Sequence, residues 1–125
     1  MRTLALVIAL VACSKSAPAI EDVTVDQLDT ALAHHETRAV DANGEMTRKH
    51  MGVIPGALLL SDGELRVSEL PADKEMSLVF YCANTECGTS HHAAEQAIAA
   101  GYTHVKVIPT NIAGWVKASK KTQSI

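Results

Sequence analysis

The sequence lacks the features that indicate a membrane-spanning or nucleic-acid-binding protein. Its apolar stretch at residues 4–12 is far shorter than the ~20 residues that a helix needs to cross a bilayer. The formal net charge is −3, and the local group of basic residues, Lys117, Lys120 and Lys121, lies at the carboxyl end, where we expect a solvated tail. We therefore expect no nucleic-acid partner. The sequence has no internal repeats or low-complexity segments, and its 125 residues favour one folded domain.

The first residues resemble an export signal of the lipoprotein type. Arg2 supplies a positive charge, residues 4–12 are uninterruptedly apolar, and small residues precede Cys13, as in a bacterial lipobox. We expect a signal peptide at residues 1–12, lipidation of Cys13, a tether at residues 13–22 and a domain at residues 23–125. The alternative is ordinary signal cleavage with Cys13 incidental. The expected location is the cell envelope, with the protein lipid-anchored on the periplasmic or extracytoplasmic side of a membrane.

Short apolar runs alternate with helical patterns along the rest of the chain. Thr24 and Gln27 have the spacing of a capping box, which predicts a helix at residues 25–34. Further helices are expected at residues 45–51 and 90–100, strands at residues 39–42, 57–60, 77–81 and 104–108, and a last turn carrying Trp115. This alternation predicts an α/β fold, a small doubly wound parallel sheet with helices on both faces.

Cys82 follows the strand expected at residues 77–81 and precedes a helix that begins near Ser90. Parallel sheets bind ligands at the carboxyl ends of their strands, where loops lead into helices. Backbone amides and the helix dipole at such a place favour a thiolate, the nucleophilic form of cysteine. The alternative is that Cys82 is a small buried hydrophobic residue. Its position alone leaves both interpretations open.

Several segments match one family pattern in order. They are Asp41 at a strand end, Gly-Val-Ile-Pro-Gly-Ala at residues 52–57, Tyr81 before Cys82, Ser-x-x-Ala-Ala at residues 90–94, Gly-Tyr-x-x-Val at residues 101–105, and Trp115. Together they resemble the rhodanese family of sulfurtransferases and their relatives over residues 23–115. The resemblance implies a rhodanese-like fold with Cys82 as the reactive centre.

The departures from the family pattern fall around that cysteine. The family usually reads Cys-x-x-Gly-x-Arg-Ser, whereas this loop is two residues longer and has Thr89 in place of the arginine. Asn43 stands where the family has an arginine after the aspartate, and Thr110 and Asn111 replace paired glycines. A fixed positive charge for an anionic substrate is therefore missing, and Glu86 adds repulsion. We do not expect efficient use of thiosulfate.

The resemblance implies that Cys82 takes sulfane sulfur from a small donor, holds it as a persulfide and passes it to an acceptor thiol. Backbone amides of residues 83–89 would stabilise the anion. The candidate substrate-binding residues are Ala83, Asn84, Thr85, Glu86, Gly88, Thr89, Ser90 and Asp41. We expect no cofactor and no metal, because His91 and His92 with the cysteines fit no standard zinc spacing. The sequence identifies no protein partner.

Cys82 and Cys87 form a Cys-x4-Cys pair, and an oxidising compartment permits them to join. The pair is either reactive, with Cys87 resolving what Cys82 carries, or a static disulfide. Two other functions therefore stay open. One is a thiol–disulfide redox or sensor module that uses both cysteines without sulfur transfer. The other is a catalytically silent binding domain, which the missing arginine favours. A phosphatase is disfavoured because the loop lacks an arginine to hold phosphate.

Overall fold

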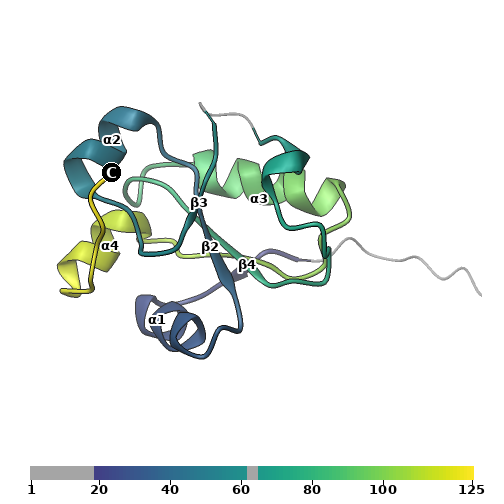
Figure 1. Ribbon diagram of the computed structural model, residues 1–125, viewed down its shortest axis with the longest axis horizontal. Helices are drawn as coiled ribbons and strands as arrows, with labels where there is room; N and C mark the ends of the chain where they lie inside the picture. Colours follow the sequence, from purple (N-terminus) through teal and green to yellow (C-terminus); the bar gives the residue numbers. More distant parts are fainter. Residues whose placement is uncertain (1–18, 62–64) are drawn as a thin grey trace, which may run out of the picture.

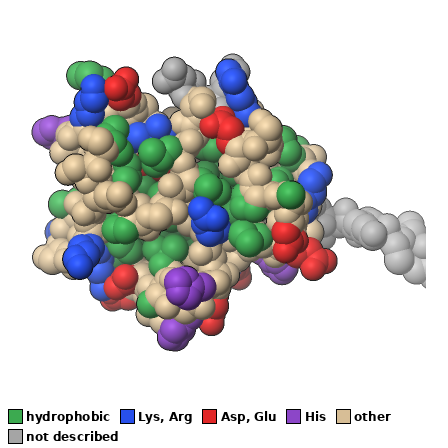
Figure 2. Space-filling view, in the orientation of Figure 1, with side chains coloured by type: hydrophobic (Ala, Val, Ile, Leu, Met, Phe, Trp, Pro, Cys, Tyr) green, Lys and Arg blue, Asp and Glu red, His purple; other side chains and the backbone are tan. Residues whose placement is uncertain are grey.

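The computed structural model describes residues 19–61 and 65–125. The expected signal peptide, Cys13 and most of the expected tether lie outside the described residues. Within the described ranges, no helix is long and apolar enough to span a membrane. On the face shown in Figure 2, basic and acidic side chains are interspersed rather than gathered into a patch of one sign.

A five-stranded parallel sheet forms the centre of the protein (Figure 1), with the strand order β1-β5-β4-β2-β3. The strands are β1 (Glu21–Asp22), β2 (Arg38–Asp41), β3 (Leu58–Leu59), β4 (Leu78–Tyr81) and β5 (Val105–Val107). All four pairings are parallel. Every residue of the central strand β4 is buried, as expected for a strand covered on both faces. The predicted fold class is confirmed.

Helices cover both faces of this sheet. On one face, α1 (Val25–Ala33) and α4 (Asn111–Lys117) enclose an apolar cluster that includes Leu28, Val79 and Trp115. On the other face, α3 (Thr89–Ala99) packs its alanines against Phe80. Helix α2 (Glu45–Met51) lies beside α4, and a short 3-10 helix spans Val67–Glu69. The predicted capping box is present, with Thr24 Oγ1 accepting from Gln27 N at 3.1 Å.

Both ends of the described chain are more ordered than the sequence indicates. The expected tether reaches Asp22, yet Glu21 and Asp22 form strand β1, paired with Lys106 and Val107 of β5. An edge strand of two exposed acidic residues has no apolar pattern, so it could not be predicted from the sequence. The expected solvated tail also packs back onto the domain: Lys120 Nζ lies 2.9 Å from Asp26 Oδ1 of α1.

Candidate active site around Cys82

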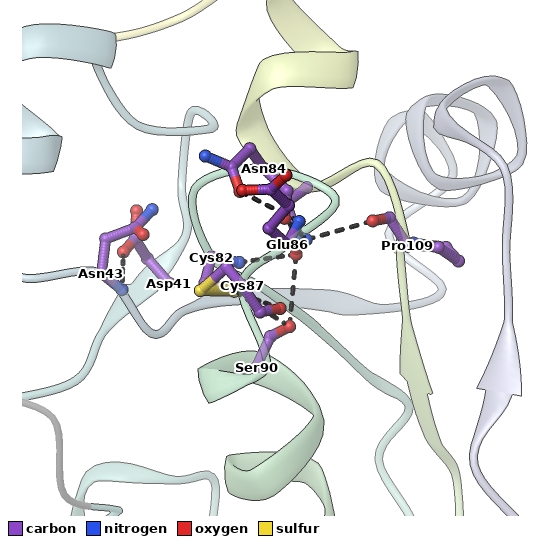
Figure 3. The surroundings of a disulfide bond; sticks show 9 residues. Asp41, Asn43, Cys82, Asn84, Glu86, Cys87, Ser90 and Pro109 are labelled. Atoms are coloured by element: carbon purple, nitrogen blue, oxygen red, sulfur yellow. Dashed lines mark hydrogen bonds between the residues drawn. A yellow bond between two sulfur atoms is a disulfide. The ribbon is translucent and has the colours of Figure 1, made fainter.

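Cys82 directly follows β4, at the carboxyl edge of the sheet, where the sequence predicted a site. The structure joins Cys82 to Cys87 by a disulfide, with 6.3 Å between their Cα atoms (Figure 3). Cys82 is fully buried at 0% exposure, whereas Cys87 is half-buried. In this oxidised form, Cys87 is therefore the more accessible residue of the pair.

The buried sulfur of Cys82 lies among polar atoms at the start of α3. Its Sγ atom is 3.3 Å from Ser90 Oγ and 3.3 Å from the carbonyl oxygen of Cys87. Ser90 is itself buried, in the first turn of the helix (Figure 3). A hydroxyl at this distance can donate to a thiolate or persulfide, and the amino end of a helix favours negative charge. The site is thus suited to an anionic sulfur at Cys82.

Asn111 links this sulfur to the rest of the site. The side chain is 2% exposed. Its Oδ1 accepts from the backbone N–H of Cys82 at 2.8 Å and from Ser90 Oγ at 3.2 Å. Its Nδ2 donates to the carbonyl oxygens of Asn84 at 2.6 Å and Pro109 at 3.1 Å. These four hydrogen bonds fix the loop relative to α3 and α4.

The backbone at Asn111 explains why this residue occupies the place of a family glycine. Its φ is +56°, in the left-handed region that glycine adopts freely. Asparagine is among the few other residues found there with little penalty. The sequence shows that asparagine replaces the glycine but does not indicate the hydrogen bonds of its side chain. The signal was an asparagine at a position where the family has glycine.

The loop between Cys82 and α3 is held by its own hydrogen bonds. Asn84 Oδ1 accepts from the N–H of Glu86 at 3.0 Å, and the carbonyl oxygen of Asn84 accepts from the N–H of Cys87 at 3.0 Å. Two of the amides expected to stabilise a bound anion are therefore engaged within the loop in the disulfide form. The side chains of Thr85, Glu86 and Thr89 are exposed.

Asp41, predicted to bind substrate, is buried in an ion pair at the end of β2. Its Oδ1 accepts from Arg48 Nε at 3.1 Å and from the N–H of Asn43 at 2.8 Å. Arg48 Nη2 also donates to the carbonyl oxygens of Asp41 and Leu60, at 3.0 and 2.7 Å. The guanidinium is thereby neutralised and tied to the strand ends. Asp41 and Arg48 hold α2 in place beside the site.

Tyr81 ties the turn at residues 52–57 to the central strand. Its hydroxyl accepts from the N–H of Ile54 at 3.0 Å. Burial raises the pKa of Tyr81 above its ordinary value, and the charge and hydrogen bonding of Asp41 raise it further. The phenol therefore stays protonated at neutral pH and acts as a structural group. The sequence placed Tyr81 before the cysteine but did not indicate this contact.

A model of the rhodanese-like domain family matches residues 24–118, which is most of this chain. The chain belongs to the rhodanese-like domain family. Among curated proteins, no sequence gives a significant match.

Several solved structures share the fold of this chain. A rhodanese-like domain from Anabaena is 19% identical, with a TM-score of 0.66, covering 86% of this chain and 81% of its own. A human single-domain sulfurtransferase is 23% identical, with a TM-score of 0.61 and coverages of 79% and 97%. A thiosulfate sulfurtransferase from Pseudomonas aeruginosa is 20% identical, with a TM-score of 0.69. The match covers 84% of this chain but 20% of that protein.

This rhodanese-like domain differs from the family pattern at the positions that surround its cysteine. Thr89, in the place of the family's arginine, is the exposed first residue of α3. The longer loop carries the second cysteine, which closes over the first. His91 and His92 are exposed on α3, and His91 Nδ1 lies 3.1 Å from Glu95 Oε1. The cysteine loop therefore carries the acidic side chain of Glu86, and the Ser90 hydroxyl lies 3.3 Å from the Cys82 sulfur.

Proposed function

We propose that this protein is a sulfurtransferase-like protein of the cell envelope that moves sulfane sulfur through a persulfide on Cys82. The observation that carries the proposal is the position of the Cys82 sulfur, 3.3 Å from the Ser90 hydroxyl at the start of α3. Membership of the rhodanese-like family supports it. So does the likeness in fold to two proteins named as sulfurtransferases, from Pseudomonas aeruginosa and human.

The proposed transfer begins from the reduced protein. The Cys82 thiolate attacks the sulfane sulfur of a donor, and the donor's remaining group leaves with the electron pair of the broken bond. The terminal sulfur of the new persulfide is then attacked by an acceptor thiolate, which restores the Cys82 thiolate. Ser90 and the amino end of α3 stabilise the negative charge at both stages. The small donor and the thiol acceptor are the partners of this reaction.

When no acceptor thiol takes the sulfur, Cys87 resolves the persulfide in this proposal. The Cys87 thiolate attacks the inner sulfur, Cys82 Sγ, of the protonated persulfide, and hydrosulfide leaves with that proton and the electron pair of the broken sulfur–sulfur bond. The sulfane sulfur gains two electrons and the two cysteines lose them, giving the Cys82–Cys87 disulfide. An external thiol then restores the reduced pair, starting at the more accessible Cys87.

A second candidate function is thiol–disulfide exchange without sulfur transfer. The disulfide between Cys82 and Cys87 favours it, because one of the two joined residues, Cys87, is only half-buried. Both functions use the same two cysteines. They differ in whether a persulfide ever forms.

Mass spectrometry of the reduced protein after exposure to a sulfane-sulfur donor separates these functions. With Cys87→Ser, we expect a gain of one sulfur on Cys82, because the resolving thiol is absent. With the wild type, we expect hydrosulfide release and a loss of two hydrogens as the disulfide forms. Cys82→Ser should acquire no sulfur. A disulfide in the wild type with no sulfur gained by Cys87→Ser would favour exchange, and no change in either protein would favour a silent binding domain.

We further propose that Cys13 anchors the protein to a membrane, as the residues before it suggest. Cells grown with a labelled fatty-acid analogue should label the wild type. The Cys13→Ser variant should incorporate no label and should no longer be found in the membrane fraction. Label retained by Cys13→Ser would contradict the anchor.

A further inference from the structure

Four residues of α2 line one groove beside the loop that follows Cys82. They are Met46, Thr47, His50 and Met51, and the groove has a volume of about 350 Å³. Positions four apart on a helix lie on the same face, which pairs Met46 with His50 and Thr47 with Met51. One short helix thus presents two thioethers and an imidazole to the same space.

The other walls of this groove are small and uncharged. Ala83 and Asn84 come from the loop, and Ala113 comes from α4. Among the described residues that line the groove, none carries a carboxylate or an ammonium group. Neither Cys82 nor Cys87 lines it, so the groove is a separate place from the disulfide.

The charged residues of α2 are engaged away from the groove. Arg48 is bound to Asp41, and its side chain is 11% exposed. Lys49 Nζ lies 2.9 Å from Glu45 Oε1, four residues earlier on the helix. Neither cation lines the groove. A positive ion that enters therefore meets no fixed positive charge in its described walls.

Met46 and His50 are accessible from solution. Met46 is 83% exposed, the largest fraction among the exposed large hydrophobic residues in the described ranges. His50 is also exposed, whereas Met51 is half-buried against the apolar cluster that α1 and α4 enclose. Packing therefore explains the methionine at residue 51 but does not account for the one at residue 46.

Thioether and imidazole groups together suit a soft monovalent metal ion. The sulfur ligands of methionine and cysteine select Cu(I), and imidazole also binds copper. Methionine has three rotatable bonds, so each sulfur can adjust to a metal held by His50. Zinc takes cysteine, histidine and carboxylate ligands, and magnesium and calcium take oxygen ligands. The lining residues of the groove offer neither a thiolate nor a carboxylate.

This set of residues differs from the one considered for zinc. The expectation of no metal rested on the spacing of His91, His92 and the cysteines. Within residues 19–61 and 65–125, no group of three or more His, Cys, Asp or Glu residues could hold a metal ion. A site with two methionine ligands is of another chemical class, and neither observation bears on it.

We propose that Met46, His50 and Met51 bind Cu(I), with the two Sδ atoms and one imidazole nitrogen as ligands. The ion enters from solution and accepts a lone pair from each of three neutral side chains, with no change in its oxidation state. This binding is independent of the proposed sulfur transfer, because it uses neither Cys82 nor Cys87.

The test uses Ag⁺, an air-stable ion with the charge and the ligand preference of Cu(I), in chloride-free buffer at neutral pH. The protein is the full chain with Cys13→Ser and with the disulfide intact, so that no free thiol competes. NMR spectroscopy then observes the isotope-labelled methyl groups of the methionines. We expect Ag⁺ to shift the signals of Met46 and Met51. Met76, which does not line the groove, should keep its signal in place.

Met46→Leu and His50→Gln, made in the same background, test two of the ligands. Both positions are exposed, and the new residues have similar size and good helix propensity, so we expect the fold to be retained. Leucine also keeps the apolar surface and removes only the sulfur. Even the outer partners of metal ligands contribute tenfold or more to affinity, so each variant should bind Ag⁺ about tenfold more weakly or worse, measured by calorimetry. Met76→Leu is the matched control and should bind as the parent does.

Cu(I) itself is then measured without oxygen, in competition with a chromogenic Cu(I) chelator. The variants should follow the same order of affinity as with Ag⁺, and a different order would overturn the assignment to Cu(I). Ag⁺ binding that leaves the signals of Met46 and Met51 in place would overturn the site. An unchanged affinity in either ligand variant would also contradict the three-ligand arrangement. Zn²⁺ should bind this groove more weakly than Ag⁺, and an equal affinity would refute the argument from soft ligands.

Discussion

Replacing Asn111 by glycine removes the side chain that connects Cys82, the loop and α4 while leaving the backbone free to keep its shape. Glycine adopts a φ of +56° without strain. The change deletes four hydrogen bonds of a buried side chain. Each contributes about 0.5–1.5 kcal/mol net, and water entering the space replaces part of the loss. We expect the free energy of unfolding to fall by about 2–4 kcal/mol, measured by urea denaturation of the oxidised protein.

The same substitution should alter the reactivity of Cys82. Asn111 Oδ1 engages the Ser90 hydroxyl, which lies 3.3 Å from the Cys82 sulfur and is a potential donor to it. Once released, the Ser90 hydroxyl can donate fully to a thiolate, an interaction of about 1.5–3 kcal/mol, where 1.4 kcal/mol corresponds to tenfold. We expect reduced Asn111→Gly to be alkylated at Cys82 up to about tenfold faster than the reduced wild type at neutral pH.

Asn111→Ala provides the control for backbone conformation. It loses the same four hydrogen bonds but also holds a Cβ atom in the left-handed region, at an extra cost of about 1–2 kcal/mol. It should therefore be less stable than Asn111→Gly. Equal stability of the two variants would refute the argument from φ. A loss below about 1 kcal/mol in Asn111→Gly would refute the argument from the hydrogen bonds.

Three further substitutions test the contacts around the site. The raised pKa of Tyr81 contributes stability that is fully present below about pH 10 and is lost as pH rises further, so Tyr81→Phe should reduce the alkaline fall in unfolding free energy. Arg48→Met leaves the buried Asp41 carboxylate without its partner and should lower the unfolding free energy by about 3–5 kcal/mol, unless Asp41→Asn is also present. Thr89→Arg should raise the rate with thiosulfate about tenfold if the side chain reaches the anion, whereas a fast wild type would show that no arginine is needed.

The sequence was sufficient to predict the fold because most of its elements have a local signal. The strand at Leu78–Tyr81 is a short run of residues that favour strands. The helix at Val25–Ala33 has its capping box, and the helix at Glu45–Met51 ends at Gly52, as expected. The strand at Glu21–Asp22 was missed because its pairing with β5 is a tertiary contact between exposed residues.

At the site, the sequence predicted positions but not contacts. The order of strand, loop and helix predicted that Cys82 lies at the end of a buried strand. The ion pair between Arg48 and Asp41 could not be predicted in this way, because it joins a strand end to a helix through side chains. Asn111 and Ser90 lie far apart in the chain and meet only because α4 and α3 both begin at the carboxyl edge of the sheet. Such contacts depend on the completed fold.

The disulfide and the proposed sulfur transfer require different states of Cys82, oxidised and reduced. The same contacts around its sulfur suit both states. In the oxidised form, Cys82 is fully buried and joined to Cys87, so the proposed transfer requires reduction first. An outside thiolate that attacks the half-buried Cys87 expels Cys82 as the leaving thiolate. That thiolate forms 3.3 Å from the Ser90 hydroxyl, at the amino end of α3. The features that make Cys82 a good leaving group on reduction are therefore those that stabilise it as the nucleophile toward a donor.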